Sequence, residues 1–446
     1  MRIHLVALGG AVMHNLAIAL KNKGYTITGS DDEIFEPSLS RLQQHGLLPE
    51  QPGWFTEKIT SSLNAVILGM HARADNPELL EAQRLNISVY NFPEYVYEQS
   101  KNKNRIAVCG SHGKTTITSM IMHCLKKADR DFDYLVGAQL EGFETMVQLS
   151  DANTIIIEGD EYFASALDKR PKFLFYQPHI TLISGIEWDH FNVFPTWQDY
   201  KNQFIQLINS LHKDSFLIYN AEDKNIDEVL TASTCKAQLL SYATPNYIIT
   251  NENTSIQTVE KKYTFNIFGK HNLQNMMGAK NICNLIGIND ETFYSAMQTF
   301  KGASKRLEIF YKNDKKIIFR DFAHAPSKVK ATIDAVKEQY LDKRLIACLE
   351  LYTFSSLNKS FIPQYKNTMQ NADVRIVYFN PHTLTLKKLP ALTIEEVKKY
   401  FNDDELIVLH DSNEIISIIK KLNFDNTAVL LMSSGNFDNV DFNVLT

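Results

Sequence analysis

A glycine-rich run at positions 110 to 116 is the part of the chain best suited to bind a phosphate. It lies between an apolar run at 105–109 and a helical pattern at 115–126, and it consists of Gly110, Ser111, His112, Gly113, Lys114, Thr115 and Thr116. In such a loop the backbone N–H groups surround phosphate oxygens, a lysine neutralises the terminal phosphates, and a threonine hydroxyl can hold Mg²⁺. The general P-loop pattern has glycine where this chain has Val108, so the match is to a shorter variant. We predict a nucleotide-phosphate site; the alternative is a plain glycine turn that starts a helix.

Acidic side chains follow two apolar runs that have the pattern of buried parallel strands. Glu158-Gly159-Asp160-Glu161 comes after the run at 154–157, and Glu187, Asp189 and His190 come after the run at 180–183. Ligands bind beyond the carboxyl ends of strands in open α/β sheets, and Mg²⁺ is usually held by one or two carboxylates together with substrate phosphates. We therefore expect a magnesium site near the glycine-rich loop, with Glu158 as a ligand. His190 is a candidate for a second metal site or for orienting an acyl group, and the alternatives are solvated acids and a structural histidine.

Three further positions carry side chains that could bind a nucleotide. The helix that begins near Gly269 carries His271, Asn272 and Asn275, and residues 272 and 275 share a face, so they could contact a base edge or simply cap the helix. Arg306 lies at the junction before the last third of the chain, and Asp321 begins a strand-end turn that runs to position 326. An aspartate at such a place is also a common helix cap.

The first hundred residues suggest a second nucleotide site. An apolar run at 3–8 is followed by Gly9-Gly10, and a strand pattern at 25–28 is followed by Gly29, Ser30 and Asp31. A GxGxxG fingerprint is absent, so the signal for a dinucleotide is weak.

The elements that must hold these residues have an α/β pattern throughout. Apolar runs at 65–68 and 87–90 extend the first β-α-β unit, a polar stretch at 100–104 is expected to be a linker outside any core, and the pattern restarts after about residue 303. In the last part we expect strands at 316–319, 345–349, 374–379 and 428–432 and a helix at 327–340. We predict three α/β domains: a Rossmann-like domain at 1–103, a P-loop ATPase-like domain at 104–303 and a second Rossmann-like domain at 304–446.

Composition excludes several classes of protein. The chain has 446 residues, a formal net charge of −5 and no basic stripe, so we expect no nucleic-acid partner. No apolar run approaches the roughly 18 residues that cross a bilayer, and we expect no membrane insertion. The five cysteines are scattered without a CxxC pair, which predicts neither a zinc site nor disulfides and fits a reducing cytoplasm. The oligomeric state is left open.

Taken together, these motifs resemble the Mur ligase superfamily, which joins amino acids or peptides to UDP-N-acetylmuramic acid using ATP. The short glycine loop, Glu158-Gly159-Asp160-Glu161, Asp189-His190, His271-Asn272 with Asn275, Arg306 and the turn at 321–324 follow the order of the family, nearly from end to end of the chain. Within the superfamily, the segments at 168–173, 187–191, 305–308 and 321–324 are most similar to the murein peptide ligases.

The resemblance implies roles for individual residues. Lys114 and Thr115 would lie at the phosphates of ATP, with Thr115, Glu158 and His190 at Mg²⁺. His271, Asn272 and Asn275 would lie near adenine, and Arg306 and Asp321 would be brought in from the third domain. The first domain would bind the UDP-sugar, and the matching positions there are Gly10, Ser30, Asp31 and His71.

The sequence departs from the family at several of its own positions. Relatives tend to have glycine at Ala7, His14 and Asn15, a second histidine at Ala325, and an arginine shortly after Glu350, where this chain continues with Leu351-Tyr352. The UDP contacts and one anion contact in the third domain must therefore differ from those of relatives.

The resemblance also implies a reaction. The enzyme would join the tripeptide L-alanyl-γ-D-glutamyl-meso-diaminopimelate to UDP-N-acetylmuramate through an acyl phosphate, in peptidoglycan recycling. The nearest alternative is the L-alanine ligase of de novo peptidoglycan synthesis, with the same chemistry and a smaller amine. An alternative of a different class is a nucleotide-dependent switch that forms no amide.

Overall fold

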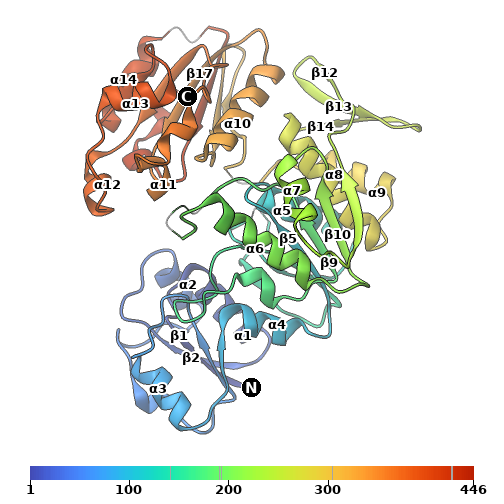
Figure 1. The fold of residues 1–446 in the computed structure, drawn as a ribbon, viewed down its shortest axis with the longest axis vertical. Coiled ribbons are helices and arrows are strands. Elements are labelled where there is room, and N and C mark those ends of the chain that lie inside the picture. Colours follow the sequence, from blue (N-terminus) through green and yellow to red (C-terminus); the bar gives the residue numbers. More distant parts are fainter. Residues whose placement is uncertain (141, 190, 192, 304, 423–424) are drawn as a thin grey trace.

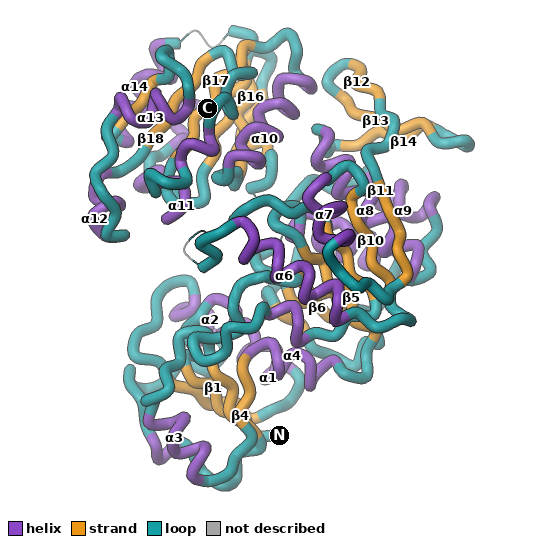
Figure 2. The backbone as a smooth tube through the Cα atoms, viewed as in Figure 1, coloured by secondary structure: helices purple, strands orange, loops and turns teal. Residues whose placement is uncertain are grey.

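Three α/β units follow one another along the chain in the computed structural model, which describes residues 1–140, 142–189, 191, 193–303, 305–422 and 425–446 (Figure 1). Each unit has its own main sheet, and the strands and helices alternate through most of the chain, as the tube drawing makes clear (Figure 2). The predicted α/β class is confirmed. The predicted domain boundaries at 103/104 and 303/304 remain a prediction.

The N-terminal unit is a four-stranded parallel sheet in the order β2-β1-β3-β4. The helix α3 is capped by Asn76, whose side chain accepts from two backbone N–H groups, and α4 begins with a capping box between Asn91 and Glu94. The strands are β1 (Arg2–Val6), β2 (Thr26–Ser30), β3 (Ala65–Leu68) and β4 (Val89–Asn91), and the helices are α1 (Ala11–Asn22), α2 (Ser38–Gln44), η1 (Thr56–Lys58), α3 (Pro77–Arg84) and α4 (Phe92–Ser100).

The predicted linker at 100–104 is only partly correct. Ser100 is the last residue of α4, is fully buried, and donates its hydroxyl to Val96 O at 2.7 Å, while Asn104 is the first residue of β5. The sequence pattern missed this because serine in a polar run is usually exposed, whereas here a backbone acceptor one helical turn away satisfies the hydroxyl.

The central unit is built on a seven-stranded sheet in the order β11-β10-β9-β5-β8-β6-β7, with β5 between β9 and β8. Side chains of β5 alternate between two cores: Ala107 and Cys109 pack with α6, while Ile106 and Val108 pack with α5 and α8. Burial on both faces explains why the strand is a continuous apolar run. Its strands are β5 (Asn104–Cys109), β6 (Asp133–Leu135), β7 (Val147–Gln148), β8 (Thr154–Glu158), β9 (Ile180–Ile183), β10 (Phe216–Asn220) and β11 (Gln238–Tyr242), and its helices are α5 (Lys114–Lys127), η2 (Lys172–Phe175), α6 (Trp197–Ser210), α7 (Lys224–Thr231), α8 (Lys270–Leu285) and α9 (Asp290–Met297).

A small antiparallel sheet, which the sequence pattern did not predict, lies between α7 and α8 in the chain. It consists of β12 (Ile248–Thr250), β13 (Asn253–Gln257) and β14 (Lys262–Phe265), and it extends beside the C-terminal unit (Figure 1). Thr254 Oγ1 donates to Gln339 Oε1 at 2.8 Å, so this sheet joins the second unit to the third.

The C-terminal unit is a six-stranded sheet in the order β15-β16-β20-β17-β18-β19, parallel except for the edge strand β15. The four predicted strands and the predicted helix at 327–340 are all present to within two residues at each end. The strands are β15 (Glu308–Lys312), β16 (Lys316–Asp321), β17 (Arg344–Glu350), β18 (Val374–Tyr378), β19 (Ile407–Leu409) and β20 (Thr427–Met432), and the helices are α10 (Pro326–Gln339), α11 (Phe354–Leu357), η3 (Ile362–Tyr365), α12 (Pro381–Leu386), α13 (Ile394–Phe401), α14 (Ser412–Lys421), η4 (Phe437–Asn439) and η5 (Phe442–Leu445).

Among the described helices, none combines the length and the apolar composition that a bilayer crossing requires. The five cysteines are all free thiols, as their spacing predicted.

Candidate active site

The glycine-rich loop connects β5 to α5, as predicted, and it offers a row of free backbone donors. Within the described part of the chain, the N–H groups of residues 112 to 116 have no hydrogen-bond acceptor, and the first intrahelical bond is Ile117 N to Gly113 O. A helix N-terminus with successive free N–H groups and a favourable dipole is an anion site. The loop is therefore built to receive phosphate oxygens.

Both glycines of this loop are required by conformation and by space. Gly110 has φ +125° and Gly113 has φ +79°, which is backbone that only glycine adopts readily. A Cβ on Gly110 would lie 2.4 Å from Ser184 Oγ, and one on Gly113 would lie 2.4 Å from Asn275 Oδ1. The loop thus packs directly against the end of β9 and against α8.

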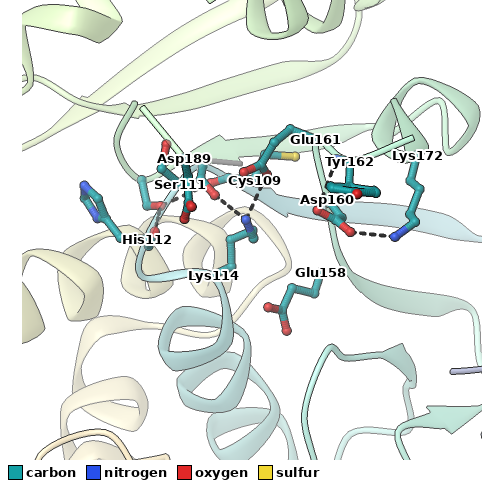
Figure 3. Close-up of polar contacts among 12 residues, drawn as sticks. Cys109, Ser111, His112, Lys114, Glu158, Asp160, Glu161, Tyr162, Lys172 and Asp189 are labelled. Atoms are coloured by element: carbon teal, nitrogen blue, oxygen red, sulfur yellow. Dashed lines mark hydrogen bonds and ion pairs between the residues drawn. The ribbon is translucent and has the colours of Figure 1, made fainter. Parts of the chain in front are cut away.

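Lys114 lies in a buried polar network (Figure 3). Its Nζ donates to Glu161 Oε2 at 2.9 Å and to Gly110 O at 2.5 Å. Tyr200 donates its hydroxyl to Glu161 Oε1 at 2.7 Å and contacts Ser111 Oγ at 2.8 Å. Burial acts to lower the pKa of Lys114, but the carboxylates of Glu161 and Asp160 outweigh it and raise the pKa above its ordinary value. Lys114 is therefore a permanent cation next to the loop's free N–H groups.

A pair of hard oxygen atoms lies beside Lys114 and suits Mg²⁺. Thr115 Oγ1 is 2.8 Å from Glu158 Oε1, and Glu158 Oε2 accepts from Gly137 N at 2.9 Å. Magnesium is commonly held by one or two protein oxygens plus substrate phosphates and water, so a full protein cage is not needed. No cluster of three or more acidic, histidine or cysteine ligands exists among the described residues. His190, the third predicted ligand, lies outside the residues that the structure describes.

The next acid along the chain has a different partner. Asp160 Oδ2 accepts from Lys172 Nζ at 2.6 Å, and both residues line the same cleft as Lys114. The three acids after β8 therefore have different partners. Glu158 contacts Thr115, Asp160 pairs with Lys172, and Glu161 pairs with Lys114.

The predicted residues of α8 lie at the edge of the phosphate loop. Asn275 faces Gly113, Asn272 Nδ2 donates to Phe268 O at 3.0 Å, and His271 is a partly buried neighbour of Gly269. Burial lowers the pKa of His271 to about 4, so the imidazole is neutral at pH 7. All three line the cleft, and their predicted contact with adenine remains a prediction.

The third unit contributes Arg306 and Asp321 to this cleft. Asp321 is buried and accepts backbone hydrogen bonds from Leu307 N and Ala323 N, each at 2.6 Å. Arg306 lies with its guanidinium carbon 4.5 Å from the centre of the Phe322 ring. Burial lowers the pKa of Arg306, while the nearby carboxylates of Asp321 and Glu158 oppose that effect. Asp321 therefore fixes the backbone beside Arg306, and Arg306 reaches toward the ATP-loop unit.

The first unit brings three of its four predicted residues to the cleft. Gly10, Asp31 and His71 line it, whereas Ser30 does not. Ser30 is fully buried and accepts from Lys58 Nζ at 3.2 Å, so this hydroxyl is part of the core of the unit. The arrangement does not support a direct UDP contact by Ser30. The Asp31 carboxylate accepts from Gly9 N at 2.6 Å, and burial raises its pKa to about 6.

The three positions where relatives have glycine are accommodated by specific contacts. Ala7 adopts φ +62°, the conformation that glycine prefers. His14 is buried, with Nδ1 2.9 Å from Ser38 Oγ. Asn15 Oδ1 accepts from Met146 N at 3.0 Å, a contact that joins the first unit to the second. Of these three positions, Asn15 therefore contributes to the contact between the first and second units.

One continuous cleft of about 1750 Å³ is lined by residues of all three units. Its lining includes Gly10 of the first unit, Lys114 of the second, and Arg306, Tyr352 and Lys387 of the third. A site for a single drug-sized ligand has roughly 300–1,000 Å³, so the cleft has room for more than one substrate.

Sequence patterns did not single out several residues that border or support the site. Lys328, in the first turn of α10, is 3.3 Å from Asp189 Oδ2 and joins the third unit to the second. Tyr200 reaches the loop from α6. No spacing rule marks such residues, because their contacts span 139 and 89 positions of the chain.

Comparisons with known proteins agree with this architecture. Residues 2–104 match the model of the Mur ligase family catalytic domain, and residues 108–283 match that of the Mur ligase middle domain. The UDP-N-acetylmuramate–L-alanine ligase of Caldicellulosiruptor saccharolyticus is 31% identical over 391 residues, with 84% of this chain and 83% of the relative covered. The ligase of the same name from Clostridium acetobutylicum is 27% identical over 451 residues, with 98% and 95% covered.

Solved structures share the fold over nearly the whole chain. The murein peptide ligase of Psychrobacter arcticus superposes with a TM-score of 0.66 at 22% identity and covers 100% of this chain and 98% of its own. The UDP-N-acetylmuramate–alanine ligase of Thermotoga maritima gives a TM-score of 0.69 at 18% identity, with 98% and 97% covered. Together with the sequence relatives, these matches show that the chain belongs to the Mur ligase family, whose members are ATP-dependent, ADP-forming ligases.

Proposed function

We propose that this ligase joins the tripeptide L-alanyl-γ-D-glutamyl-meso-diaminopimelate to UDP-N-acetylmuramate, in peptidoglycan recycling. The observation that carries the proposal is the extent of the cleft, which continues in the C-terminal unit past His324 to Tyr352, Thr353, Lys387 and Ser434. A single L-alanine would leave this extension unused. Membership of the ligase family argues against the alternative of a nucleotide switch that forms no amide.

The proposed reaction has two steps. An oxygen of the muramyl carboxylate attacks the γ-phosphorus of ATP, the bond to the β–γ bridging oxygen breaks, and ADP leaves an acyl phosphate. The free amine of the peptide then attacks the acyl carbon, and the tetrahedral species expels inorganic phosphate and loses the amine proton to give the amide. Charge stabilisation and positioning supply most of the catalysis of phosphoryl transfer.

Different residues of the cleft are assigned to the ATP phosphates, to Mg²⁺ and to the positioning of a further cation. The free N–H groups of residues 112 to 116 and Lys114 bind the phosphates of ATP and balance their charge. Thr115 and Glu158 hold Mg²⁺, with His190 as a further proposed ligand, and the ion when bound neutralises phosphate charge. Arg306 adds a cation from the third unit, and Asp321 positions it by holding the backbone of Leu307.

Binding residues complete the assignment. His271, Asn272 and Asn275 border the adenine end, and Gly10, Asp31 and His71 border the UDP-sugar end. With three units around the cleft, water is excluded from the acyl phosphate, which would otherwise hydrolyse.

The L-alanine ligase of de novo synthesis is the second candidate, because both sequence relatives described above carry that name. Phosphate release separates the two: purified enzyme is supplied with ATP, Mg²⁺, UDP-N-acetylmuramate and either tripeptide or L-alanine. We expect kcat/KM for the tripeptide to exceed that for L-alanine, and mass spectrometry to detect the UDP-muramyl-tripeptide. Turnover of L-alanine at a comparable or higher kcat/KM would reject the peptide assignment.

A further inference from the structure

The far end of the cleft is formed by segments that follow three adjacent strands of the C-terminal sheet. Tyr352 and Thr353 follow β17, Lys387 follows α12 after β18, and Ser434 follows β20. These strands are neighbours in the order β20-β17-β18. Because ligands bind beyond the carboxyl ends of parallel strands, this edge is where a third substrate is expected.

The side chain of Tyr352 is held in place by its surroundings. A Cβ on Gly435 would lie 2.8 Å from Tyr352 Cγ and 2.9 Å from Glu350 Oε2, so the ring packs directly on the glycine backbone. The ammonium group of Lys387 lies over this ring, with Nζ 5.1 Å from the ring centre. A lysine over an aromatic face is attracted by the ring quadrupole, which restricts where its ammonium group lies.

The charge of Lys387 is not used by the protein itself. Among the described residues, its ammonium group has no carboxylate partner. Two acids of these segments have other partners: Glu350 Oε2 accepts from Phe437 N at 2.8 Å, and Asp438 Oδ2 accepts from Asn380 Nδ2 at 2.6 Å. The hydroxyl of Ser434 also has no hydrogen-bond partner within the described part of the chain. Ser434 Oγ is itself buried, so the ammonium group of Lys387 is the unpaired polar group that this end of the cleft presents among the described residues.

The spacing of the sheet gives the length of ligand that reaches this point. Asp321, which positions Arg306, ends β16, and β17, which Tyr352 and the ammonium group of Lys387 lie beyond, is two steps away in the sheet. At about 4.8 Å per step the ends of these two strands are roughly 10 Å apart. An extended tripeptide spans roughly 10 Å before its terminal side chain is counted, whereas one amino acid cannot cover the distance.

We propose that Lys387, held on the Tyr352 ring, binds a carboxylate of the amine substrate at the end of the peptide remote from the reacting amine. The site would thus select an acidic peptide. This inference rests on the proposed function and adds to it the residue that binds the remote carboxylate of the peptide.

The test compares two peptides in four enzymes. The peptides are the tripeptide and a form of it in which the carboxyl groups of the third residue are amidated, and the enzymes are wild type, Lys387→Met, Lys387→Arg and Lys388→Met. Lys388 is the matched control, because it is the next residue, carries the same charge and is exposed outside the cleft. Phosphate release gives KM and kcat for each pair.

We expect Lys387→Met to raise KM for the tripeptide about tenfold with kcat within about twofold, which is the usual size of one charge-assisted contact. Lys387→Arg should retain most of the affinity, and Lys388→Met should match wild type. With the amidated peptide, wild type and Lys387→Met should have equal KM values. Melting temperatures of the four proteins verify that each is folded.

Two results overturn the inference in distinguishable ways. If wild type uses the tripeptide but Lys387→Met leaves KM for the tripeptide unchanged, another residue binds the remote carboxylate. In that case only this inference fails. If wild type uses L-alanine as well as the tripeptide or better, the proposed function fails in the wild-type data alone, and the inference fails with it.

Discussion

At the scale of single residues, the phosphate site depends on one lysine whose partners are all anionic or carbonyl oxygens. Lys114 donates to Glu161 and Gly110, and Glu161 is in turn held by Tyr200. The side chain of Glu161 is fully buried, so its charge needs the lysine. Lys114 thus supports the local structure as well as the proposed chemistry.

We predict that Lys114→Ala reduces ADP formation by on the order of 10²–10³-fold or more, because the cation that stabilises the transferred phosphoryl group is lost. Binding of UDP-N-acetylmuramate, measured by calorimetry, should stay within a few-fold, since Gly10, Asp31 and His71 belong to another unit. The control is Lys127→Ala, an exposed lysine at the end of the same helix. Loss of both activities with retained folding would contradict the assignment of the two binding regions.

Partly buried histidines around the cleft make stability depend on pH. Burial lowers the pKa of His112 to about 3 and that of His324 to about 4, with Lys328 adding to both shifts. The unfolded chain has histidines with an ordinary pKa of about 6.5, so between pH 6.5 and 4 it binds more protons than the folded chain. Stability contributed by these groups is therefore complete above pH 6.5 and is lost as the pH falls toward 4.

Between pH 6 and 4.5, the free energy of unfolding of the wild type falls as the pH falls. We predict that His324→Gln makes this fall smaller by about 1 kcal/mol per pH unit, the amount expected for one proton. Urea unfolding at several pH values measures it. The exposed His382→Gln, with the same change of side chain, should follow wild type. Identical pH slopes for His324→Gln and wild type would mean that His324 is protonated in the folded protein.

At the scale of elements, the turn between β5 and α5 is fixed by its neighbours. The end of β9 and the face of α8 contact the two loop glycines so closely that no Cβ fits at either position. The same contacts aim the free N–H groups of the loop into the cleft. Sequence spacing identifies the loop, but the packing of two distant elements sets its shape.

We predict that Gly113→Ala weakens ATP binding at least tenfold, because φ is +79° and the new methyl would overlap Asn275. Gly24→Ala is the matched control: its φ is +87°, yet nothing lies within 4 Å of the new Cβ. The Gly24→Ala variant therefore pays for a positive φ at alanine, about 1 kcal/mol of stability, but has no steric clash. Its ATP affinity should equal that of wild type. Equal ATP affinity in both variants would show that the loop tolerates a displaced Asn275.

At the scale of the whole molecule, the three units around the cleft are joined by apolar packing, as between Phe268 and Phe319, and by polar contacts. Asn15 accepts from Met146, Thr254 donates to Gln339, and Lys328 pairs with Asp189. The last of these joins the third unit to the segment that leads to His190. The position of Arg306 beside Glu158 therefore depends on contacts outside the site.

We predict that Lys328→Met lowers kcat for amide formation by up to about tenfold, since a partly buried ion pair between the units is lost. The radius of gyration, measured by small-angle scattering, should increase as the third unit separates. Lys330→Met removes an exposed lysine of the same helix, paired within that helix to Asp334, and should have no effect on either quantity. Equal kcat values for the two variants would exclude Asp189–Lys328 as a closing contact.

The sequence by itself determined many of the elements and predicted the phosphate site. Runs of apolar residues placed β3 and β9 at their observed bounds, because strands buried on both faces need continuous apolar sequence. The glycine loop and the acids after β8 were predicted from residue type and spacing. The motif order also led to the Mur ligase family, which the comparisons confirmed.

Only the tertiary structure decided which side chains share the cleft. Ser30 follows a predicted strand yet is buried, whereas Lys387 belongs to no recognised motif and borders the cleft with its ammonium group on the Tyr352 ring. Tyr200 and Lys328 likewise act through partners far away in the chain. Local spacing records the conformation of a few neighbouring residues, but contacts across the chain depend on how whole elements pack, and no short pattern encodes that packing.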